Sequence, residues 1–373
     1  LSPMRPFSSR TPRWLLALCL LLAVSGAAKA QPISESRLQR AVDVLETFMD
    51  TSRVPGLSGA IAVDGEVRWT GGFGYANLQH RVPATDSTRY RIASISKPIA
   101  ATVAMTLVEE GRLNLGKPIR SYLPLFPKKR GRITTRQLLS HTAGIRHYRD
   151  DEFLSDTRYE SRLGPVSIFA DDSLLFEPGT QFSYSTYGYT LASAVMEAAA
   201  DSTFLKLLEA RIRKPLGLES IVPEKTEQVI PNEASFYLVK TSNGDTTVVN
   251  APYVDNSNKW TGGGLLATPA DLTRFVSALL NGRILPENRV QQMFSTQAEI
   301  EDESYHYGLG WFVGTDDQGR RRVWHTGGAV GGSGVVLFYP ERELIIATLA
   351  NASDVPHLDL ADRMATLLLG DEP

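Results

Sequence analysis

The stretch Ser94-Ile95-Ser96-Lys97 stands where the chain changes from β-rich to helix-rich sequence. It opens an apolar segment that predicts a helix over 94–111, since a proline such as Pro98 is tolerated in a first turn. Spacing of three residues places Ser94 and Lys97 on one helical face, with Cβ atoms about 5–6 Å apart. A lysine there can accept or direct the serine proton, and the helix N-terminus favours developing negative charge. Because the pattern alone is common by chance, the rest of the chain decides its meaning.

Upstream of this stretch, the sequence predicts a helix and then an antiparallel ribbon. Residues 33–49 carry apolar side chains at three- and four-residue spacing after the capping candidate Ser34. Two β-rich runs, 57–63 and 66–75, are joined by Asp64-Gly65. This pair favours a type I′ hairpin turn, which needs positive φ at both central residues.

Downstream, a helix-rich middle precedes a β-rich end. Helices are predicted at 94–111, 135–140, 190–200, 204–212, 269–280 and 357–369, and strands at 308–313, 322–325, 334–339 and 344–349. Strands near both termini predict one antiparallel sheet completed by both ends, an α/β (α+β) fold with an inserted all-helical domain. We place the sheet part at about 31–93 and 300–373, the insert at about 94–299, and the site in a cleft between them.

Two further motifs support a catalytic role for the serine and the lysine. Tyr184-Ser185-Thr186 lies in a tyrosine-rich run, and a tyrosine acts as a base only where cationic neighbours such as Lys97 or His325 favour the phenolate. His325-Thr326-Gly327-Gly328 lies at the end of a predicted strand, where glycines let a ligand approach the backbone. The N–H groups of Gly328 and Ser94 could then form an oxyanion hole.

The first thirty residues predict a cleavable signal peptide. They contain four basic and no acidic residues, an apolar block over 14–24, and the small-x-small pattern Ala28-Lys29-Ala30, so cleavage is expected after Ala30. Eleven apolar residues are too few to span a bilayer, which takes about 20. A secreted or periplasmic protein over 31–373 is therefore expected, with no stable membrane span.

Composition narrows the chemistry of the mature chain. The only cysteine, Cys19, falls in the signal peptide, which excludes disulfides and a cysteine nucleophile. Loss of the four basic residues moves the net charge from −2 to −6, so a nucleic-acid partner is not expected. The histidines show no paired metal-ligand spacing, and we expect neither a metal nor a cofactor.

The order of these motifs, with the serine early, the tyrosine in mid-chain and His-Thr-Gly late, resembles the serine β-lactamase and penicillin-binding protein superfamily, particularly its class C-like branch. The chain is more similar still to the mitochondrial β-lactamase-like serine proteases and their bacterial relatives. The resemblance rests on stretches that run across nearly the whole mature chain: 91–97, 144–148, 184–191, 252–257 and 325–331.

The resemblance implies a β-lactamase/transpeptidase-like fold and an acyl-enzyme at Ser94. It assigns Lys97 and Tyr184 as the acid/base pair, with His325 beside them, and the N–H groups of Ser94 and Gly328 as the oxyanion hole. The remaining residues expected to line the substrate site are Thr186, Thr326, Gly327 and His147.

Two departures bear on the substrate. Thr186 stands where class C enzymes usually carry asparagine, and His325 where they carry lysine. Both changes remove groups that hold a β-lactam, so a peptidase or esterase acting on a peptide or small molecule is expected. The mitochondrial relatives also carry a charged insertion after the stretch matching His147-Tyr148, and this chain is short there, so their filament assembly does not carry over.

Three alternatives stay open at the level of sequence. The same residues would serve a D,D-carboxypeptidase or D-amino-acid peptidase, a β-lactamase, or a penicillin-binding-like sensor that acylates without turnover. The sequence is compatible with a homo-oligomer and does not define its size.

Overall fold

The computed structural model describes residues 2–3, 33–242 and 245–370. The predicted signal peptide, with Cys19 and the cleavage site after Ala30, therefore lies almost wholly outside the described residues. Among the described helices, none combines the length and apolar character needed to cross a membrane.

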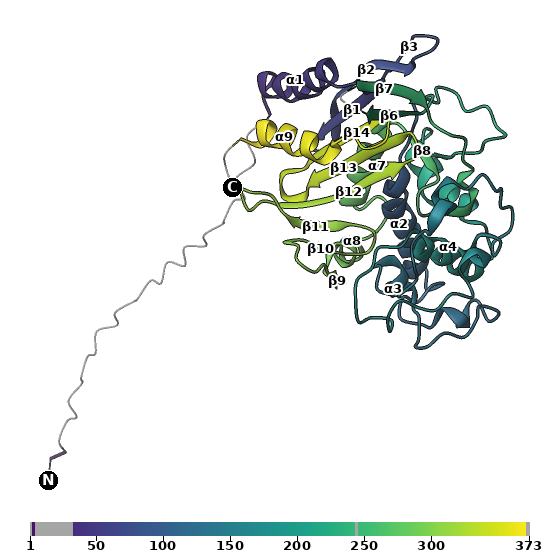
Figure 1. Cartoon of the computed structure of the whole chain (residues 1–373). Helices are drawn as coiled ribbons and strands as arrows, with labels where there is room; N and C mark the ends of the chain where they lie inside the picture. Colours follow the sequence, from purple (N-terminus) through teal and green to yellow (C-terminus); the bar gives the residue numbers. More distant parts are fainter. Residues whose placement is uncertain (1, 4–32, 243–244, 371–373) are drawn as a thin grey trace. The chain divides into compact units, whose positions relative to one another are not determined.

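A nine-stranded antiparallel sheet forms the centre of the body that begins at Ile33, and both ends of that body build it (Figure 1). In spatial order its strands are β3 (Val82–Pro83), β2 (Glu66–Asn77), β1 (Gly56–Val63), β14 (Leu344–Ala350), β13 (Gly332–Tyr339), β12 (Arg321–Ala329), β11 (Phe312–Thr315), β10 (His306–Tyr307) and β9 (Ala298–Glu299). The two ends meet at β1 and β14, where Ala60 lies opposite Ala347. The predicted sheet, completed by strands from both ends, is confirmed.

The opening hairpin forms where the sequence predicts it. Strands β1 and β2 are joined at Asp64 and Gly65, whose φ angles are 52° and 80°. These positive values fit the predicted turn, because Gly and Asp tolerate the left-handed region better than most residues.

Two layers of helices cover the sheet (Figure 1). Helices α1 (Glu35–Thr51) and α9 (His357–Leu369) pack against each other, and α9 lies against β13 and β14. Their buried face includes Leu45 and Leu368, which join Leu337 and Ile346 of the sheet in one apolar cluster. On the other face, α7 (Pro269–Leu280) packs against β1, β2 and β14.

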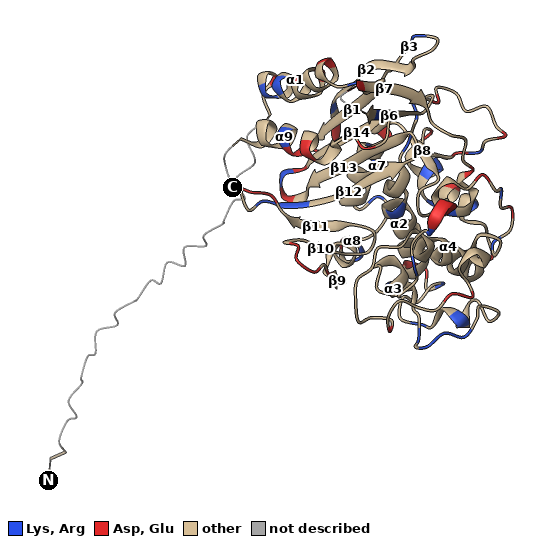
Figure 2. Ribbon diagram, in the orientation of Figure 1, with Lys and Arg blue, Asp and Glu red and all other residues tan. Residues whose placement is uncertain are grey.

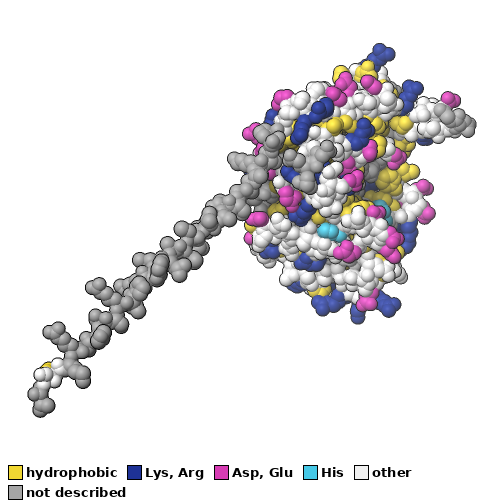
Figure 3. All heavy atoms as spheres, turned by 90° about the vertical axis from the view of Figure 1, so that its left-hand side faces the viewer, with side chains coloured by type: hydrophobic (Ala, Val, Ile, Leu, Met, Phe, Trp, Pro, Cys, Tyr) yellow, Lys and Arg dark blue, Asp and Glu magenta, His cyan; other side chains and the backbone are white. Residues whose placement is uncertain are grey.

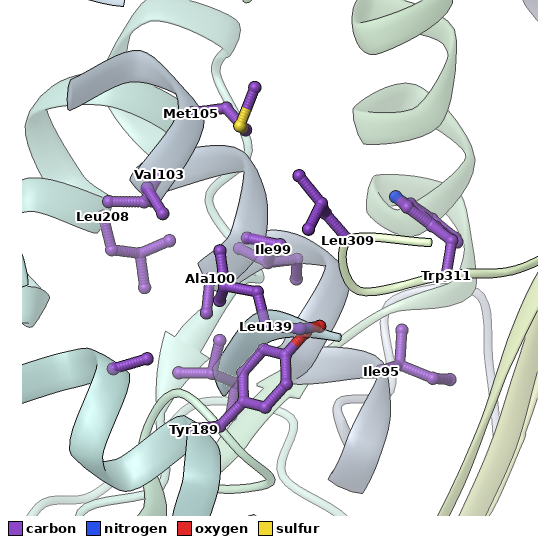
Figure 4. Packing of buried hydrophobic residues seen from close by; sticks show 14 of the residues in the cluster. Ile95, Ile99, Ala100, Val103, Met105, Leu139, Tyr189, Leu208, Leu309 and Trp311 are labelled. Atoms are coloured by element: carbon purple, nitrogen blue, oxygen red, sulfur yellow. The ribbon is translucent and has the colours of Figure 1, made fainter. Parts of the chain in front are cut away.

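Helix α2 (Ser96–Glu109) is buried along most of its length, and α4 (Thr186–Ala200) and α5 (Phe204–Leu208) pack against it. Helix α3 (Thr135–Leu139) packs against α4 and α8 (Glu287–Phe294) against α7, and the short α6 (Lys214–Leu216) follows α5 along the chain. Figure 4 shows side chains of α2, such as Ile99 and Val103, packed among Leu139, Leu208 and Leu309. Because α2 is surrounded by apolar side chains, any polar group on it must find its partners inside the protein.

The structure differs from the predicted elements around the site. Ser94 lies in a 3-10 turn, η1 (Ala93–Ile95), and α2 begins only at Ser96. Helix α4 begins at Thr186, four residues before its predicted start, because the Ser185 hydroxyl accepts a hydrogen bond from the Gly188 N–H. The His-Thr-Gly-Gly motif lies inside β12, which continues to Ala329 and does not end at His325 as predicted.

The range predicted as the helical insert also contains strands. Short strands β4 (Tyr90–Arg91), β5 (Val222–Pro223) and β8 (Leu265–Ala267) form a small sheet, and β6 (Tyr237–Ser242) pairs with β7 (Asp245–Asn250). The division of the chain at about residues 93 and 300 stays a prediction.

Charge is distributed as expected for a buried central sheet. Strands β1, β13 and β14 contain no charged residue, and they are tan in Figure 2. On the face seen in Figure 3, basic and acidic side chains are interspersed over most of the surface. The charged residues therefore surround the core and are mixed in sign on this face.

Gly327 lies close to the residue that precedes η1, and this generates a prediction. A Cβ at Gly327 would lie 2.3 Å from the Ile92 carbonyl oxygen, whereas a Cβ at Gly328 would meet no heavy atom within 4 Å. We expect Gly327→Ala to lower the free energy of unfolding by about 1–3 kcal/mol, because β12 must move away from η1. The matched control Gly328→Ala should unfold like the wild type in urea. Equal stability of the two variants would contradict the close approach.

Candidate active site

Ser94 lies on a tightly held turn between β4 and α2. The preceding residue, Ala93, has a φ of 48°, an unusual value for a residue with a Cβ atom. Arg91, in β4, forms a buried ion pair with Glu224, with Nε 2.9 Å from Oε1, and also donates to the Val330 carbonyl. Since Val330 follows β12, Arg91 ties the segment before Ser94 to the turn after the His-Thr-Gly-Gly motif.

Lys97 points from α2 into a fully enclosed position, with 0% of the residue exposed. Its Nζ lies within hydrogen-bond distance of Ser94 Oγ at 2.9 Å, of Thr186 Oγ1 at 3.2 Å and of the Gly262 carbonyl at 2.7 Å. The serine itself is partly exposed. The predicted pairing of Ser94 and Lys97 is therefore present, with the serine reachable from outside and the lysine sealed beneath it.

Burial determines the protonation of Lys97. Desolvation, and then the positive charge of Lys259, hold the pKa of Lys97 well below its ordinary value. A neutral amine has two N–H donors and one lone pair. The Gly262 carbonyl can only accept and Thr186 can also accept, so the lone pair is left for the Ser94 hydroxyl proton.

Tyr184 lies just before α4, with its ring centroid 4.8 Å from Lys97 Nζ. Burial raises its pKa above the ordinary value for a phenol, and interaction with the Ser94 hydroxyl opposes the rise only in part. The prediction that cationic neighbours favour a phenolate is therefore wrong for the free protein. Tyr184 keeps its proton and is placed to donate it.

His325 faces the same site from β12 but is not a cation. Its Nδ1 lies 2.6 Å from the Thr326 carbonyl and its Nε2 3.0 Å from the Tyr307 hydroxyl. A carbonyl can only accept, so Nδ1 carries the proton and Nε2 accepts from Tyr307. Burial lowers the pKa of His325 to about 3. The expectation that His325 could act as a cation beside Tyr184 is therefore wrong.

The rest of the motif lines the free edge of β12. Within the described residues, Thr326, Gly327 and Gly328 pair with β13 on one side and have no strand partner on the other. Both β12 and β13 contact η1, which lies against the face of the sheet to which a Cβ at Gly327 would point. Gly328 is exposed, with open space beside it. This position fits the predicted oxyanion hole, whose assignment stays a prediction.

Thr186 and His147 close the other side of the lysine. The Thr186 hydroxyl accepts from Lys97, and its N–H donates to His147 Nδ1 at 3.4 Å. Burial, to which the charge of Lys259 adds, lowers the pKa of His147 to about 4. Both predicted residues therefore lie at the site, and His147 is neutral at ordinary pH.

Sequence reasoning missed three contributors. The Gly262 carbonyl binds Lys97, the His141 ring lies 4.2 Å from the Tyr184 ring, and the Lys259 ammonium is close enough to lower the pKa of Lys97. The buried Nδ1 of His141 also accepts a hydrogen bond from the Ser185 N–H at 3.1 Å. No local pattern signals these roles, because each depends on segments distant in sequence.

The site shows side chains suited to proton transfer and no evident place for a metal. Across the described ranges, no three His, Cys, Asp or Glu side chains lie close enough together to hold a metal ion. A reachable serine beside a neutral lysine and a protonated tyrosine can carry out nucleophilic acyl transfer. Together with the sheet and its helices, this site defines the class of β-lactamase-like and penicillin-binding folds.

The chain belongs to the β-lactamase family, whose model, described as Beta-lactamase, matches residues 41–371. It is also 31% identical to the human serine beta-lactamase-like protein LACTB, mitochondrial, over 93% of this chain and 77% of that protein. The resemblance seen in the motifs is therefore confirmed across nearly the whole chain.

Solved structures agree on the fold. The octameric penicillin-binding protein homologue from Pyrococcus abyssi superposes with a TM-score of 0.79 and 27% identity, covering 90% of this chain and 78% of that one. A D-stereospecific amidohydrolase from Streptomyces sp. gives 0.74 and 27%, covering 91% of this chain and 100% of that one. The predicted fold class is confirmed, and the relatives support a serine hydrolase in general terms.

The neutral state of His325 predicts a pH dependence of stability. Its pKa of about 3 in the folded protein lies below the value of about 6.5 expected when unfolded, so protonation favours unfolding. Its contribution is complete above about pH 6.5 and is lost as the pH falls toward 3, with a slope of up to about 1.4 kcal/mol per pH unit.

We therefore expect His325→Gln, which keeps an acceptor for Tyr307, to reduce the slope of unfolding free energy against pH between about pH 4 and 6 by roughly one proton. Urea unfolding across this range measures the slope independently of any constant loss of stability. His80→Gln, at an exposed position, is the control for removing a histidine. An unchanged slope in His325→Gln would show that His325 is not held neutral.

Proposed function

We propose that this protein is a serine hydrolase that forms an acyl-enzyme at Ser94 and acts as a peptidase or esterase. The observation that carries the proposal is the 2.9 Å contact between Ser94 Oγ and the sealed amine of Lys97. A lysine kept neutral by burial is a base that can activate a serine at ordinary pH.

In the proposed reaction, Ser94 Oγ attacks the substrate carbonyl carbon while its proton moves to Lys97 Nζ. The resulting oxyanion is held by N–H groups at Ser94 and Gly328. Tyr184 gives its proton to the leaving nitrogen or oxygen, the bond to the leaving group breaks, and Lys97 returns a proton to Tyr184. Water then attacks the acyl carbon, gives a proton to Lys97, and Ser94 leaves with that proton.

The neutral side chains around the serine favour a peptide or ester over a β-lactam. A β-lactam carries a carboxylate, and His325, with its pKa lowered to about 3, gives that group no positive charge from β12. Similarity to the D-stereospecific amidohydrolase from Streptomyces supports an amide as the substrate of this protein. Hydrolysis of an amide includes the D,D-carboxypeptidase and D-amino-acid peptidase reactions. A sensor that acylates without turnover would use the same first half-reaction.

The test of the acyl-enzyme is covalent labelling of Ser94. We expect a fluorophosphonate to add once to the wild-type protein and peptide mapping to place the adduct on Ser94. Ser94→Ala should not be labelled, and its turnover of any ester or peptide substrate found should fall by on the order of a millionfold. Ser96→Ala, two residues away on the same segment, is the control. Labelling of Ser94→Ala, or none of the wild type, would overturn the proposal.

We also propose export to the periplasm or the exterior, supported by the basic and apolar pattern of residues 1–30. The human relative is described as mitochondrial. Expression of the full chain in a bacterial host should give a mature form beginning at Gln31 in the periplasmic fraction, as read by N-terminal sequencing. Uncleaved protein in the cytoplasmic fraction would contradict export.

A further inference from the structure

Lys259 is a nearly buried cation near the catalytic residues, and the reaction above does not use it. It ends η6 (Asn256–Lys259), and 7% of the residue is exposed. Its Nζ lies 5.2 Å from the centroid of the Tyr148 ring and 5.1 Å from that of Phe153. Aromatic faces attract a cation but do not neutralise it.

The ammonium of Lys259 is connected to the catalytic residues through Tyr148 and through its charge. The Tyr148 ring that it contacts lies 4.3 Å from the His147 ring, and the Tyr148 hydroxyl interacts with Thr186, which accepts from Lys97. The charge of Lys259 is close enough to lower the pKa of both Lys97 and His147. The charge of Lys259 therefore acts on Lys97, which contacts the catalytic serine.

Lys259 lacks the partners that other buried cations have. Among the described residues, its ammonium makes no hydrogen bond and no ion pair within 4.0 Å, whereas Arg91 is paired with Glu224. Glu224 also accepts from Asn256, and Asp255 accepts from the Ser257 N–H and the Thr226 hydroxyl. The nearest acidic side chains are therefore occupied elsewhere.

We propose that the Lys259 ammonium binds a carboxylate group of the substrate, so that this enzyme selects substrates carrying a free carboxylate near the bond that is cleaved. The proposal rests on the proposed hydrolase function and names its substrate class. A buried charge without a counter-ion is costly, and a carboxylate from the substrate would pair with it. His325 is neutral, so Lys259 is the cation near the serine that remains free to pair with an anion.

The ionisation of Lys259 is consistent with this role. Burial, and then the charge of Arg91, lower its pKa to about 8, against the opposing effect of Glu224 and Asp255. It is therefore largely protonated at neutral pH, and a bound carboxylate would favour the protonated form further. Preference for the carboxylate should decline as the pH rises through about 8.

Matched thioesters test the proposal because they differ only in charge. In one pair the carboxylate, or the neutral amide that replaces it, is on the leaving group, which is mercaptoacetate or mercaptoacetamide. In the other pair it is on the acyl group, which is succinyl or succinamyl. We expect the wild type to favour the carboxylate in one pair by about 10- to 100-fold in kcat/KM, as charge-assisted hydrogen bonds suggest. Lys259→Met should bring that ratio close to one, and Lys259→Arg should retain part of it.

The controls separate this proposal from its rivals. Lys206→Met removes an exposed lysine of α5 and should keep the wild-type ratio. If Lys259→Met lowered kcat/KM equally for the carboxylate and the amide substrates, Lys259 would act only through Lys97 or the fold. That result would overturn the proposal. A wild type without preference in both pairs would also overturn it. Absence of fluorophosphonate labelling at Ser94 would instead count against the hydrolase itself.

Discussion

Burial of the Lys97 amine is the constraint on which the rest of the site depends. The amine reaches Ser94 three residues earlier, Thr186 in another helix, and the Gly262 carbonyl 165 residues away. An ammonium sealed in this position would cost several kcal/mol, so the group gives up its proton and becomes a base. The core of α2 is thus part of the chemistry, because the apolar packing around it excludes the water that would keep the lysine charged.

The sheet supplies the other half of the site because both ends of the chain form it. Joining β1 to β14 places β13 and then β12 further along, and β12 extends beyond β11. The lack of a side chain at Gly327 allows β12 to lie close to Ile92, and Arg91 holds the turn after β12 through the Val330 carbonyl. The nucleophile and the strand that faces it are therefore positioned by contacts between segments more than two hundred residues apart.

The features that could be predicted from the sequence depend on neighbouring residues. Asp64-Gly65 predicted its turn through backbone conformation, Ser34 predicted the cap of α1, and the spacing of Ser94 and Lys97 predicted their contact. Protonation states could not be predicted, because the pKa of His325 and Tyr184 depends on burial by distant segments. The start of α4 was missed for a related reason. Its tyrosine-rich sequence is typical of a loop, and the burial of these tyrosines depends on the folded core.

Charge and catalysis are carried by different parts of this site. The side chains that touch the serine, Lys97 and Tyr184, are held neutral by burial, and so is His325 on β12. A positive charge lies on η6, at Lys259, beside the aromatic ring of Tyr148. This charge makes no direct contact with the serine, yet it is close enough to lower the pKa of Lys97. Binding of an anion at Lys259 would therefore also change the strength of the base, so charge recognition and proton transfer are coupled at this site.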